Sequence, residues 1–472
     1  MRVLFWFRKD LRLEDNTGLH EAARDARGDV LPFYASEPEA LGRDGIAAIR
    51  VRFLLESLAD LAGAVERAGS ALAIARGSPT RTVLEAARRA GADAVYWNDE
   101  YEPSLMERDR KVEAALGRAG IRVRRFHDRL LTPPGMAMTA SGRPFVVYTP
   151  FRRACERLPL PLPFPAVRRL APHDLPRSPQ PTLEELGFST GQQAWPGGRR
   201  AARARLGRFL RGGLARYAPE RDFPAAGAHA SISADLGLGT LSPRTVAAAV
   251  LEAARADRRL RASAEKFVAE LRWRDFYAHV LHYFPHCERG AFRREHDAIR
   301  WEGRPGHLAR WQEGRTGYPF VDAAMRELAA TGFMHNRSRM IVASFLTKDL
   351  LLDWRLGERH FMRRLVDGDL ASNNGGWQWA AGTGTDAQPF FRIFNPVLQG
   401  ERFDPGGEYV RRWAPELARV PERWIHRPWD APPLVLAEAG VRLGKHYPRP
   451  VVDHAAQRER ALAMYRSADR RA

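Results

Sequence analysis

The chain begins Met1-Arg2-Val3-Leu4-Phe5-Trp6-Phe7, so that five consecutive apolar residues follow a single arginine. Four more short apolar runs lie in the first 130 residues, at 30–34, 71–75, 94–97 and 121–126. Amphipathic stretches such as 46–68 and 81–90 separate these runs. Apolar runs that alternate with helical patterns predict a doubly wound, parallel α/β sheet. No G-x-G-x-x-G motif follows the first run, which argues against a dinucleotide bound in Rossmann fashion.

Beyond the predicted sheet, proline marks a change of structure. Eight prolines stand among the 23 residues from 159 to 181, a density that excludes a helix or a central strand and predicts an extended linker. From about residue 200 the pattern is helical. Ser242-Pro243 is typical of a helix start, and further helices are expected over 263–284, 322–330 and 336–352. We therefore expect an α/β domain (1–130), a proline-rich interdomain linker (131–199) and an all-helical domain (200–472).

Composition restricts the class of protein. A chain of 472 residues is too long for one compact core, and its 44% hydrophobic content is that of a globular protein. Lysine and arginine number 75 against 56 acidic residues, which leaves a net charge of +19. Such a surplus favours nucleic acid as a partner, although a solvated, arginine-rich surface would produce the same number.

The expected compartment follows from cysteine content and from the apolar segments. Cys155 and Cys287 are too few for a disulfide framework, which favours a reducing environment. The first residues lack the layout of a signal peptide, and no apolar run approaches the ~18 residues of a spanning helix. We expect a soluble, cytoplasmic, monomeric protein.

One helical stretch combines residue types that make poor core. Glu270, Trp273, Arg274 and Tyr277 are spaced i, i+3, i+4 and i+7, so they share one helix face. Unpaired charges are costly to bury, and this face suits a planar, hydrogen-bonding ligand such as a base or a flavin ring. The alternative is a structural helix that carries an Arg–Glu pair.

Three more segments concentrate aromatic, arginine and Asp/Asn residues. In 334–340, Arg337 and Arg339 are two apart and point in different directions. Asp367-Gly368-Asp369, followed by Asn373-Asn374-Gly375-Gly376-Trp377-Gln378-Trp379, offers acceptors for ribose hydroxyls or ring N–H groups. No histidine or cysteine stands nearby, so we expect no metal site. The run Phe390-Phe391-Arg392-Ile393-Phe394-Asn395 is typical of a nucleic-acid surface.

These segments stand among further motifs: Trp311-Gln312-Glu313-Gly314, Tyr318-Pro319, Asp349-Leu350 and Thr385-Asp386. With them, the chain resembles the DNA photolyase/cryptochrome family, and within it most of all the bacterial class I cyclobutane pyrimidine dimer photolyases. The resemblance covers almost the whole chain and is strongest from about 217 to 413. It implies light-driven repair of these dimers in DNA by a flavoprotein lyase.

The resemblance implies FAD, bent into a U, inside the helical domain. Tyr217 and Ser231-Ile232-Ser233 match positions that hold the phosphates, while Glu270 and Arg274 close over the cofactor. Arg339 and Asp367 match an ion pair beside the isoalloxazine ring. Asp369 matches a ring or ribose contact, and Asn373 faces flavin N5. Glu270 and Asn373 are the expected catalytic side chains.

For catalysis, the resemblance implies fully reduced, anionic FAD that lends an electron to a flipped-out dimer and recovers it afterwards. Trp273 and Trp379 match the indoles that stack on the lesion, and Asn336 and Met340 match other lesion contacts. Contacts to DNA phosphates are implied for Arg221, Arg337 and Arg392. Trp301, Trp354 and Trp377 match a chain that carries electrons from the surface to oxidised flavin.

The sequence departs from the family pattern at several places. His229-Ala230 replace a Thr-Ser pair before the phosphate-binding segment. Either backbone N–H groups or a protonated His229 would then serve the phosphate, and we favour His229. Phe267 and Phe333 stand where tryptophan is common. Leu105 replaces a glutamate that anchors folate, so a second, antenna chromophore is left open between deazaflavin, FMN, folate and none.

Three other functions fit the sequence less well than repair of cyclobutane dimers. A cryptochrome photoreceptor often carries a long C-terminal extension, and here only a short tail follows the helical core. A (6-4) photoproduct photolyase depends on two histidines, where this sequence has Asn336 and Met340. An electron-carrying flavoprotein would not explain the basic surplus beside an aromatic pocket.

Overall fold

The computed structural model describes residues 1–37, 45–193, 195–387 and 389–469. Its first part is a five-stranded sheet in the order β3-β2-β1-β4-β5, and every neighbouring pair is parallel. The strands are β1 (Val3–Phe7), β2 (Val30–Ser36), β3 (Ala73–Arg76), β4 (Ala94–Asn98) and β5 (Arg122–Phe126). The predicted parallel sheet is confirmed, and each strand overlaps the apolar run expected for it.

Side chains that alternate along β1 build two hydrophobic layers. Val3, Phe5 and Phe7 belong to the layer beneath α1 (Thr17–Asp25) and α3 (Ala48–Arg67). Leu4 and Trp6 belong to the layer beneath α4 (Pro79–Arg89) and α5 (Pro103–Arg118). Because successive side chains of a strand point to opposite faces and helices cover both faces, the whole strand is apolar.

The segment between sheet and helical region contains a helix that we did not predict, α6 (Tyr148–Glu156), which buries Tyr148, Phe151 and Cys155. Residues 159–181 contain no helix, as expected, and one isolated strand bridge. Backbone hydrogen bonds from Leu170 and Ser178 fasten this stretch to the sheet part of the molecule. The proline-rich stretch is therefore a fixed strap.

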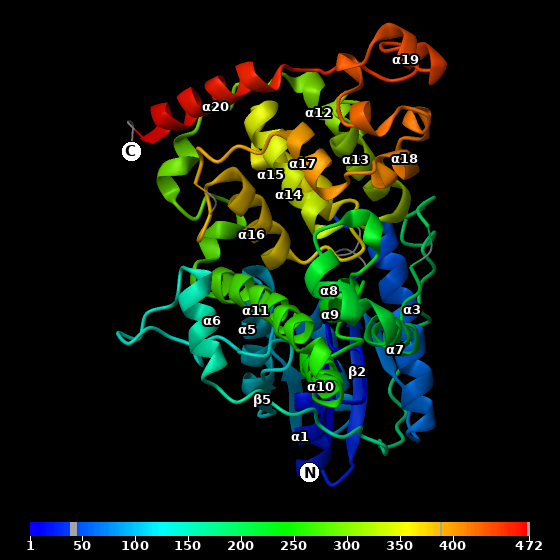
Figure 1. The fold of residues 1–472 in the computed structure, drawn as a ribbon. Helices are drawn as coiled ribbons and strands as arrows, with labels where there is room; N and C mark the ends of the chain where they lie inside the picture. Colours follow the sequence, from blue (N-terminus) through cyan, green and yellow to red (C-terminus); the bar gives the residue numbers. More distant parts are fainter. Residues whose placement is uncertain (38–44, 194, 388, 470–472) are drawn as a thin grey trace.

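From residue 199 onward the chain is helical. The longer helices are α7 (Arg199–Arg208), α8 (Leu214–Glu220), α9 (Ser233–Leu238), α10 (Pro243–Ala256), α11 (Arg261–Tyr283), α12 (Pro305–Gln312), α13 (Pro319–Thr331), α14 (Asn336–Ser344), α15 (Trp354–Met362), α16 (Leu370–Ala381), α17 (Pro396–Phe403), α18 (Glu408–Trp413), α19 (Pro433–Glu438) and α20 (His454–Asp469). In Figure 1, α11 crosses the middle of the molecule, above the sheet and below α14 to α16.

Two expectations about helix bounds are corrected by the structure. The helix expected over 336–352 ends at Ser344, where the chain continues as a π-helical turn, Phe345–Asp349. The helix expected from residue 263 already begins at Arg261. The expected start of α10 is confirmed, since the Ser242 hydroxyl accepts a hydrogen bond from the Arg244 N–H at 3.1 Å.

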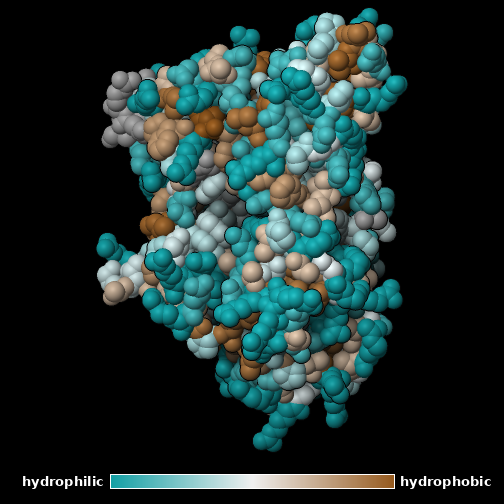
Figure 2. Space-filling view, in the orientation of Figure 1, coloured by the Kyte–Doolittle hydropathy of each residue, from teal (hydrophilic) through white to brown (hydrophobic). Residues whose placement is uncertain are grey.

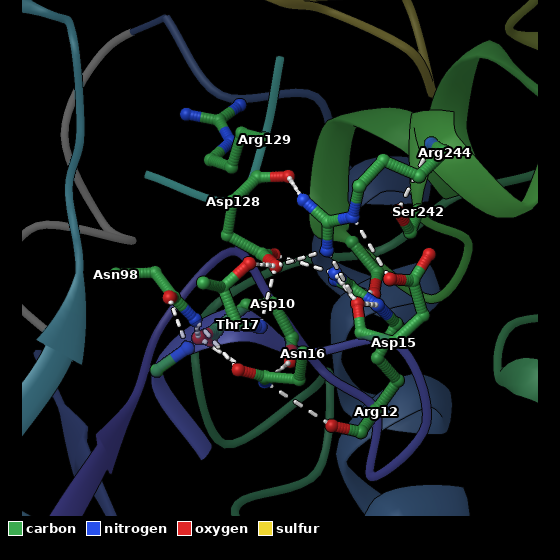
Figure 3. A network of polar contacts seen from close by, with 12 residues as sticks. Asp10, Arg12, Asp15, Asn16, Thr17, Asn98, Asp128, Arg129, Ser242 and Arg244 are labelled. Carbon is green, nitrogen blue, oxygen red and sulfur yellow. Dashed lines mark hydrogen bonds and ion pairs between the residues drawn. The ribbon is translucent and has the colours of Figure 1, made fainter. Parts of the chain in front are cut away.

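Buried charges join the sheet part to the helical region (Figure 3). Arg244 of α10 donates to Asp15 Oδ1 at 2.8 Å and to Asp128 Oδ1 at 2.7 Å. Arg12 donates to the other oxygen of Asp128 at 2.5 Å, and all four side chains are at most 4% exposed. Burial alone would raise the pKa of Asp128, but Arg12 and Arg244 outweigh it and hold the pKa below its ordinary value. This network fixes the two parts against each other.

Figure 2 shows that hydrophilic residues cover most of one face and that hydrophobic residues form small, separate patches. Within the described residues, no helix combines the length and apolar character needed to cross a membrane.

Candidate FAD- and lesion-binding site

A cavity of about 560 Å³ lies in the helical region. Helices α8, α9, α11, α14 and α16, together with the turns before α9, α14 and α16, supply most of its lining. The lining includes every residue expected from the sequence to bind the cofactor, the lesion or DNA, except Arg392. Of the three tryptophans expected to carry electrons, Trp377 lines the cavity, and Trp301 and Trp354 do not. Residues far apart in the sequence therefore meet at one place. A volume of this size is ordinary for a cofactor site.

The expected ion pair stands at the cavity wall. Arg339 Nη2 donates to Asp367 Oδ1 at 3.0 Å and to Oδ2 at 2.8 Å. Asp367 Oδ2 also accepts from the Ser233 hydroxyl at 2.6 Å, which connects the start of α9 to the pair. The Arg339 guanidinium is held further by Met334 O at 2.8 Å. A fixed cation and anion side by side can polarise a planar ring that lies against them.

Asp369 is held at the same wall by a helix start and by two arginines. Its Oδ1 accepts from Ser372 N at 2.9 Å and so caps α16. Burial would raise its pKa, but Arg274 and Arg129 lower it to about 2. The carboxylate is therefore ionised at neutral pH. Arg129, 3.7 Å away, comes from the segment after β5 and was not expected from the sequence.

The face of α11 that carries Glu270 and Arg274 lies at the cavity, but these two residues bond to other partners and not to each other. Glu270 accepts from Arg221 Nη1 at 2.6 Å, at the end of α8. Arg274 donates to the backbone carbonyls of Arg129 and Leu236. The structure thus contradicts the alternative of an Arg–Glu pair within the helix. It also shows that Arg221, expected at a DNA phosphate, is anchored beside Glu270.

His229 differs from expectation. Its Nδ1 lies 2.7 Å from the Ser231 hydroxyl, and its ring stacks on Phe333 with centroids 5.4 Å apart. Burial lowers the pKa of His229, which disfavours the imidazolium that we expected. Ser231 adopts a φ of 53°, a left-handed conformation that a non-glycine residue rarely takes. The turn before α9 is shaped by this backbone conformation.

The residues expected to contact a lesion lie on α11, α14 and α16. Trp273 is half-buried and stacks on Tyr148, with ring centroids 3.7 Å apart and planes 12° apart. Trp379, also half-buried, lines the cavity from α16. Asn336 Nδ2 lies 3.9 Å from Met340 Sδ on the same face of α14. Tyr148 was missed because it belongs to the segment interpreted as linker.

Arg337 and Asn373 are both fixed by neighbours. Arg337 donates to Asp222 at 2.8 Å, and its guanidinium lies over the Phe403 ring at 4.2 Å. Asn373 Nδ2 donates to the Glu358 carbonyl at 3.0 Å. Since that bond fixes the amide nitrogen, the orientation of the Asn373 side chain at the cavity is set by α15. Burial raises the pKa of Glu358 itself to about 7.

The three expected electron-chain tryptophans share one hydrophobic cluster. Trp377 lines the cavity and is 2% exposed, and Trp354 is equally buried at the start of α15. Trp301 packs against the same cluster from the outside and touches Tyr465 of α20, at 6.1 Å between centroids. Gly357 is required here, since a Cβ would lie 2.1 Å from the Trp377 ring.

Among the described residues, no group of three or more His, Cys, Asp or Glu side chains could hold a metal ion.

Comparisons with known proteins agree over the whole length. Residues 3–168 match the family model described as DNA photolyase, and residues 267–467 match the FAD binding domain of DNA photolyase. The deoxyribodipyrimidine photo-lyase of Agrobacterium fabrum is 43% identical, with 98% of this chain and 97% of the relative covered. The enzyme of the same name from Escherichia coli is 41% identical, with 98% of each covered.

Solved structures give the same result. A bacterial class III photolyase from Agrobacterium tumefaciens superposes with a TM-score of 0.92 at 42% identity, covering 99% of this chain and 98% of that one. A Synechocystis cryptochrome gives 0.90 at 31% identity, covering 98% and 99%. An archaeal photolyase from Sulfolobus tokodaii, solved with two FAD molecules, gives 0.82 at 33%, covering 99% and 100%. The chain belongs to the DNA photolyase/cryptochrome family.

Proposed function

We propose that this protein repairs cyclobutane pyrimidine dimers in DNA with light, using reduced FAD held in the helical cavity. The curated relatives named deoxyribodipyrimidine photo-lyase support this reaction. One observation carries the proposal: a single cavity is lined both by the Arg339–Asp367 pair and by the indoles of Trp273 and Trp379. Groups suited to a flavin ring and groups suited to stacked bases therefore face the same space.

The residues present fit FAD. Tyr217 and the turn 229–233 line the cavity and would hold the phosphates, while Arg339, Asp367 and Asn373 line it and would hold the ring system. When bound, reduced and excited, FAD supplies one electron to the dimer and takes it back after the ring has opened. Glu270 fixes Arg221, and α15 fixes the amide of Asn373, so both polar side chains are oriented before ligand enters.

The remaining roles follow from position. Trp273 and Trp379 stack on the flipped dimer, with Asn336 and Met340 beside them. Arg221, Arg337 and Arg392 contact phosphates of the DNA, to which a net charge of +19 adds long-range attraction. Trp301, Trp354 and Trp377 form the path by which electrons from outside reach the cavity. No group in this account has to act as general base.

Several finer expectations belong to the same proposal. The three domains are 1–130, 131–199 and 200–472, and the protein acts as a monomer in the cytoplasm. We infer class I from the resemblance of the sequence motifs alone, and the similar Agrobacterium structure is named a class III enzyme. A second chromophore is proposed without a fixed identity, since Leu105 replaces the folate-anchoring glutamate and the Sulfolobus relative holds a second FAD.

The test is repair of a dimer-containing oligonucleotide by the chemically reduced protein. Under blue light the absorbance of the restored pyrimidines should return, and in darkness it should not. A cryptochrome without repair activity would bind FAD yet restore nothing. Repair of (6-4) photoproducts, without repair of cyclobutane dimers, would favour a (6-4) photolyase. Asn336 and Met340 disfavour that reaction, because it depends on histidines at these two positions.

A further inference from the structure

Thr385 and Asp386, one of the motifs of the sequence, lie outside the cavity lining and contact the start of α6. The Thr385 hydroxyl donates to the carbonyl of Val146. The N–H of Tyr148 donates to Asp386 Oδ2 at 3.1 Å. The loop that follows α16 is therefore bonded twice to the segment 146–148.

The second of these bonds replaces a missing helix cap. Val147 stands at the N-cap of α6 and has no side-chain oxygen, so the first N–H groups of the helix lack an acceptor from their own segment. Asp386 supplies that acceptor from more than 230 residues away, together with a negative charge at the positive end of the helix. Asp386 has a φ of 46°, a left-handed conformation that costs free energy in a non-glycine residue.

The residue that Asp386 holds also supports an indole of the proposed lesion site. Tyr148 covers one face of Trp273 at 3.7 Å, and its hydroxyl donates to the Ala269 carbonyl on α11 at 2.5 Å. With the ring clamped at both its backbone and its hydroxyl, Tyr148 gives the indole a rigid backing. The cavity side of Trp273 is left for a ligand.

A direct contact between α11 and α16 completes the arrangement. A Cβ at Gly375 of α16 would lie 2.1 Å from Cδ1 of Tyr277 on α11, so only glycine allows this approach. The helices that carry Trp273 and Trp379 are thus joined directly at Gly375 and indirectly through Tyr148 and Asp386.

We infer that Asp386 and Tyr148 are positioning residues for the lesion: they form a clamp that fixes the indole of Trp273 relative to that of Trp379. This inference rests on the proposed repair function, because the spacing of the two indoles matters only if bases stack between or against them. Neither residue touches the lesion, and both act through Trp273.

The experiment compares binding of dimer-containing and intact oligonucleotides by the FAD-loaded protein. Asp386→Ala and Tyr148→Leu should each weaken dimer binding by about five- to tenfold, with FAD content and intact-DNA affinity unchanged. Asp386→Asn keeps an acceptor and Tyr148→Phe keeps the stacked ring, so both should retain affinity to within about twofold.

A matched control exists in the same chain. Asp60 of α3 caps α7 from a distance, accepting from the Arg199 N–H at 2.7 Å, while Gly198 at the N-cap offers no side chain. Asp60→Ala should cost thermal stability like Asp386→Ala but leave dimer affinity unchanged.

The outcomes distinguish failure of the proposed repair function from failure of the Asp386–Tyr148 clamp. If the parent protein binds dimer and intact DNA equally, the proposed function is contradicted. If the parent prefers the dimer and both Asp386→Ala and Tyr148→Leu keep that preference, the clamp alone is wrong. Loss of FAD or of intact-DNA binding in step with dimer binding, or an equal loss in Asp60→Ala, would also overturn it, since general destabilisation would then explain the effect.

Discussion

The charges between the sheet part and the helical region and the charges at the cavity are used in opposite ways. Between these two parts, Arg244 bonds the carboxylates of Asp15 and Asp128, and Arg12 bonds Asp128 and the backbone carbonyl of Asp15. All four side chains are buried and hydrogen-bonded. At the cavity, Arg339 is 26% exposed although its partner Asp367 is 4% exposed. Saturated charges have nothing left to offer a ligand, whereas an ion pair at an open wall can still interact with one. The contrast separates the residues that hold the molecule together from those that bind.

The largest effect is expected from breaking the interface. Arg244→Ala removes the arginine bonded to the buried Asp15 carboxylate and one of the two arginines bonded to Asp128, and we expect a loss of about 3–5 kcal/mol in the free energy of unfolding. Arg339→Ala removes a partly exposed partner and should cost clearly less. Urea unfolding of both variants measures this, and equal losses would erase the distinction between the two regions.

Asp275 of α11 and Asp128 should make the stability of the protein depend on pH in opposite directions. Burial raises its pKa to about 7 from the ordinary 3.8, so the folded protein binds its proton more tightly than the unfolded chain. The stability that it contributes is complete below about pH 4 and is lost as pH rises towards 7. The lowered pKa of Asp128 has the opposite sign: its contribution holds above pH 4 and is lost only in stronger acid.

Asp275→Asn should therefore flatten the decline in unfolding free energy between about pH 4 and pH 7, a change on the order of a few kcal/mol. Urea unfolding at several pH values measures the slope. An unchanged slope would show that Asp275 is ionised in the folded protein at both ends of this range.

At the cavity, Trp273→Ala should weaken dimer binding by ~1–3 kcal/mol, or about ten- to a hundredfold. FAD content should stay near normal. Affinity for intact DNA should change little, because phosphate contacts dominate it. Titration with the two oligonucleotides measures the difference, and equal weakening on both would reject the stacking role.

The smallest of these effects concerns the turn before α9. Since burial lowers the pKa of His229 and Ser231 is bonded to its Nδ1, FAD retention should change little between about pH 6 and about pH 8.5. Ala230→Ser should tighten FAD binding, by about tenfold at most, through a new hydroxyl donor. FAD dissociation rates test both, and a retention that falls with pH and becomes flat in His229→Ala would restore the imidazolium role.

The sequence predicted an element best where a run of apolar residues corresponds to a strand buried on both faces. The run Val3–Phe7 predicted β1 residue for residue, because a central parallel strand must be apolar on both faces. Helix α6 carried a visible signal, with Tyr148, Phe151 and Cys155 at i, i+3 and i+7, but the prolines after it dominated the interpretation. The π-helical turn after Ser344 had no such signal.

The family motifs pointed to residues that line the cavity, but not to the partners of those residues. Arg221 was expected at a phosphate, yet its partner Glu270 became visible only when α8 and α11 packed together. Arg129, Tyr148 and Asp222 contact site residues from distant segments. A single sequence holds no trace of such pairings, since they depend on how the chain folds back on itself.

We propose that the cavity performs light-driven repair with reduced FAD, separately from the path that delivers electrons to it. Trp301→Phe distinguishes the two processes, because phenylalanine is much harder to oxidise than tryptophan. Loaded with chemically reduced FAD and given a dimer-containing oligonucleotide, the variant should restore pyrimidine absorbance in light at the parent's rate, and neither protein should do so in darkness. When each protein is loaded with oxidised FAD and given an external thiol, light should reduce the FAD of the parent but not the FAD of the variant. Loss of repair in the pre-reduced variant, or no light-dependent restoration by the parent, would contradict the account.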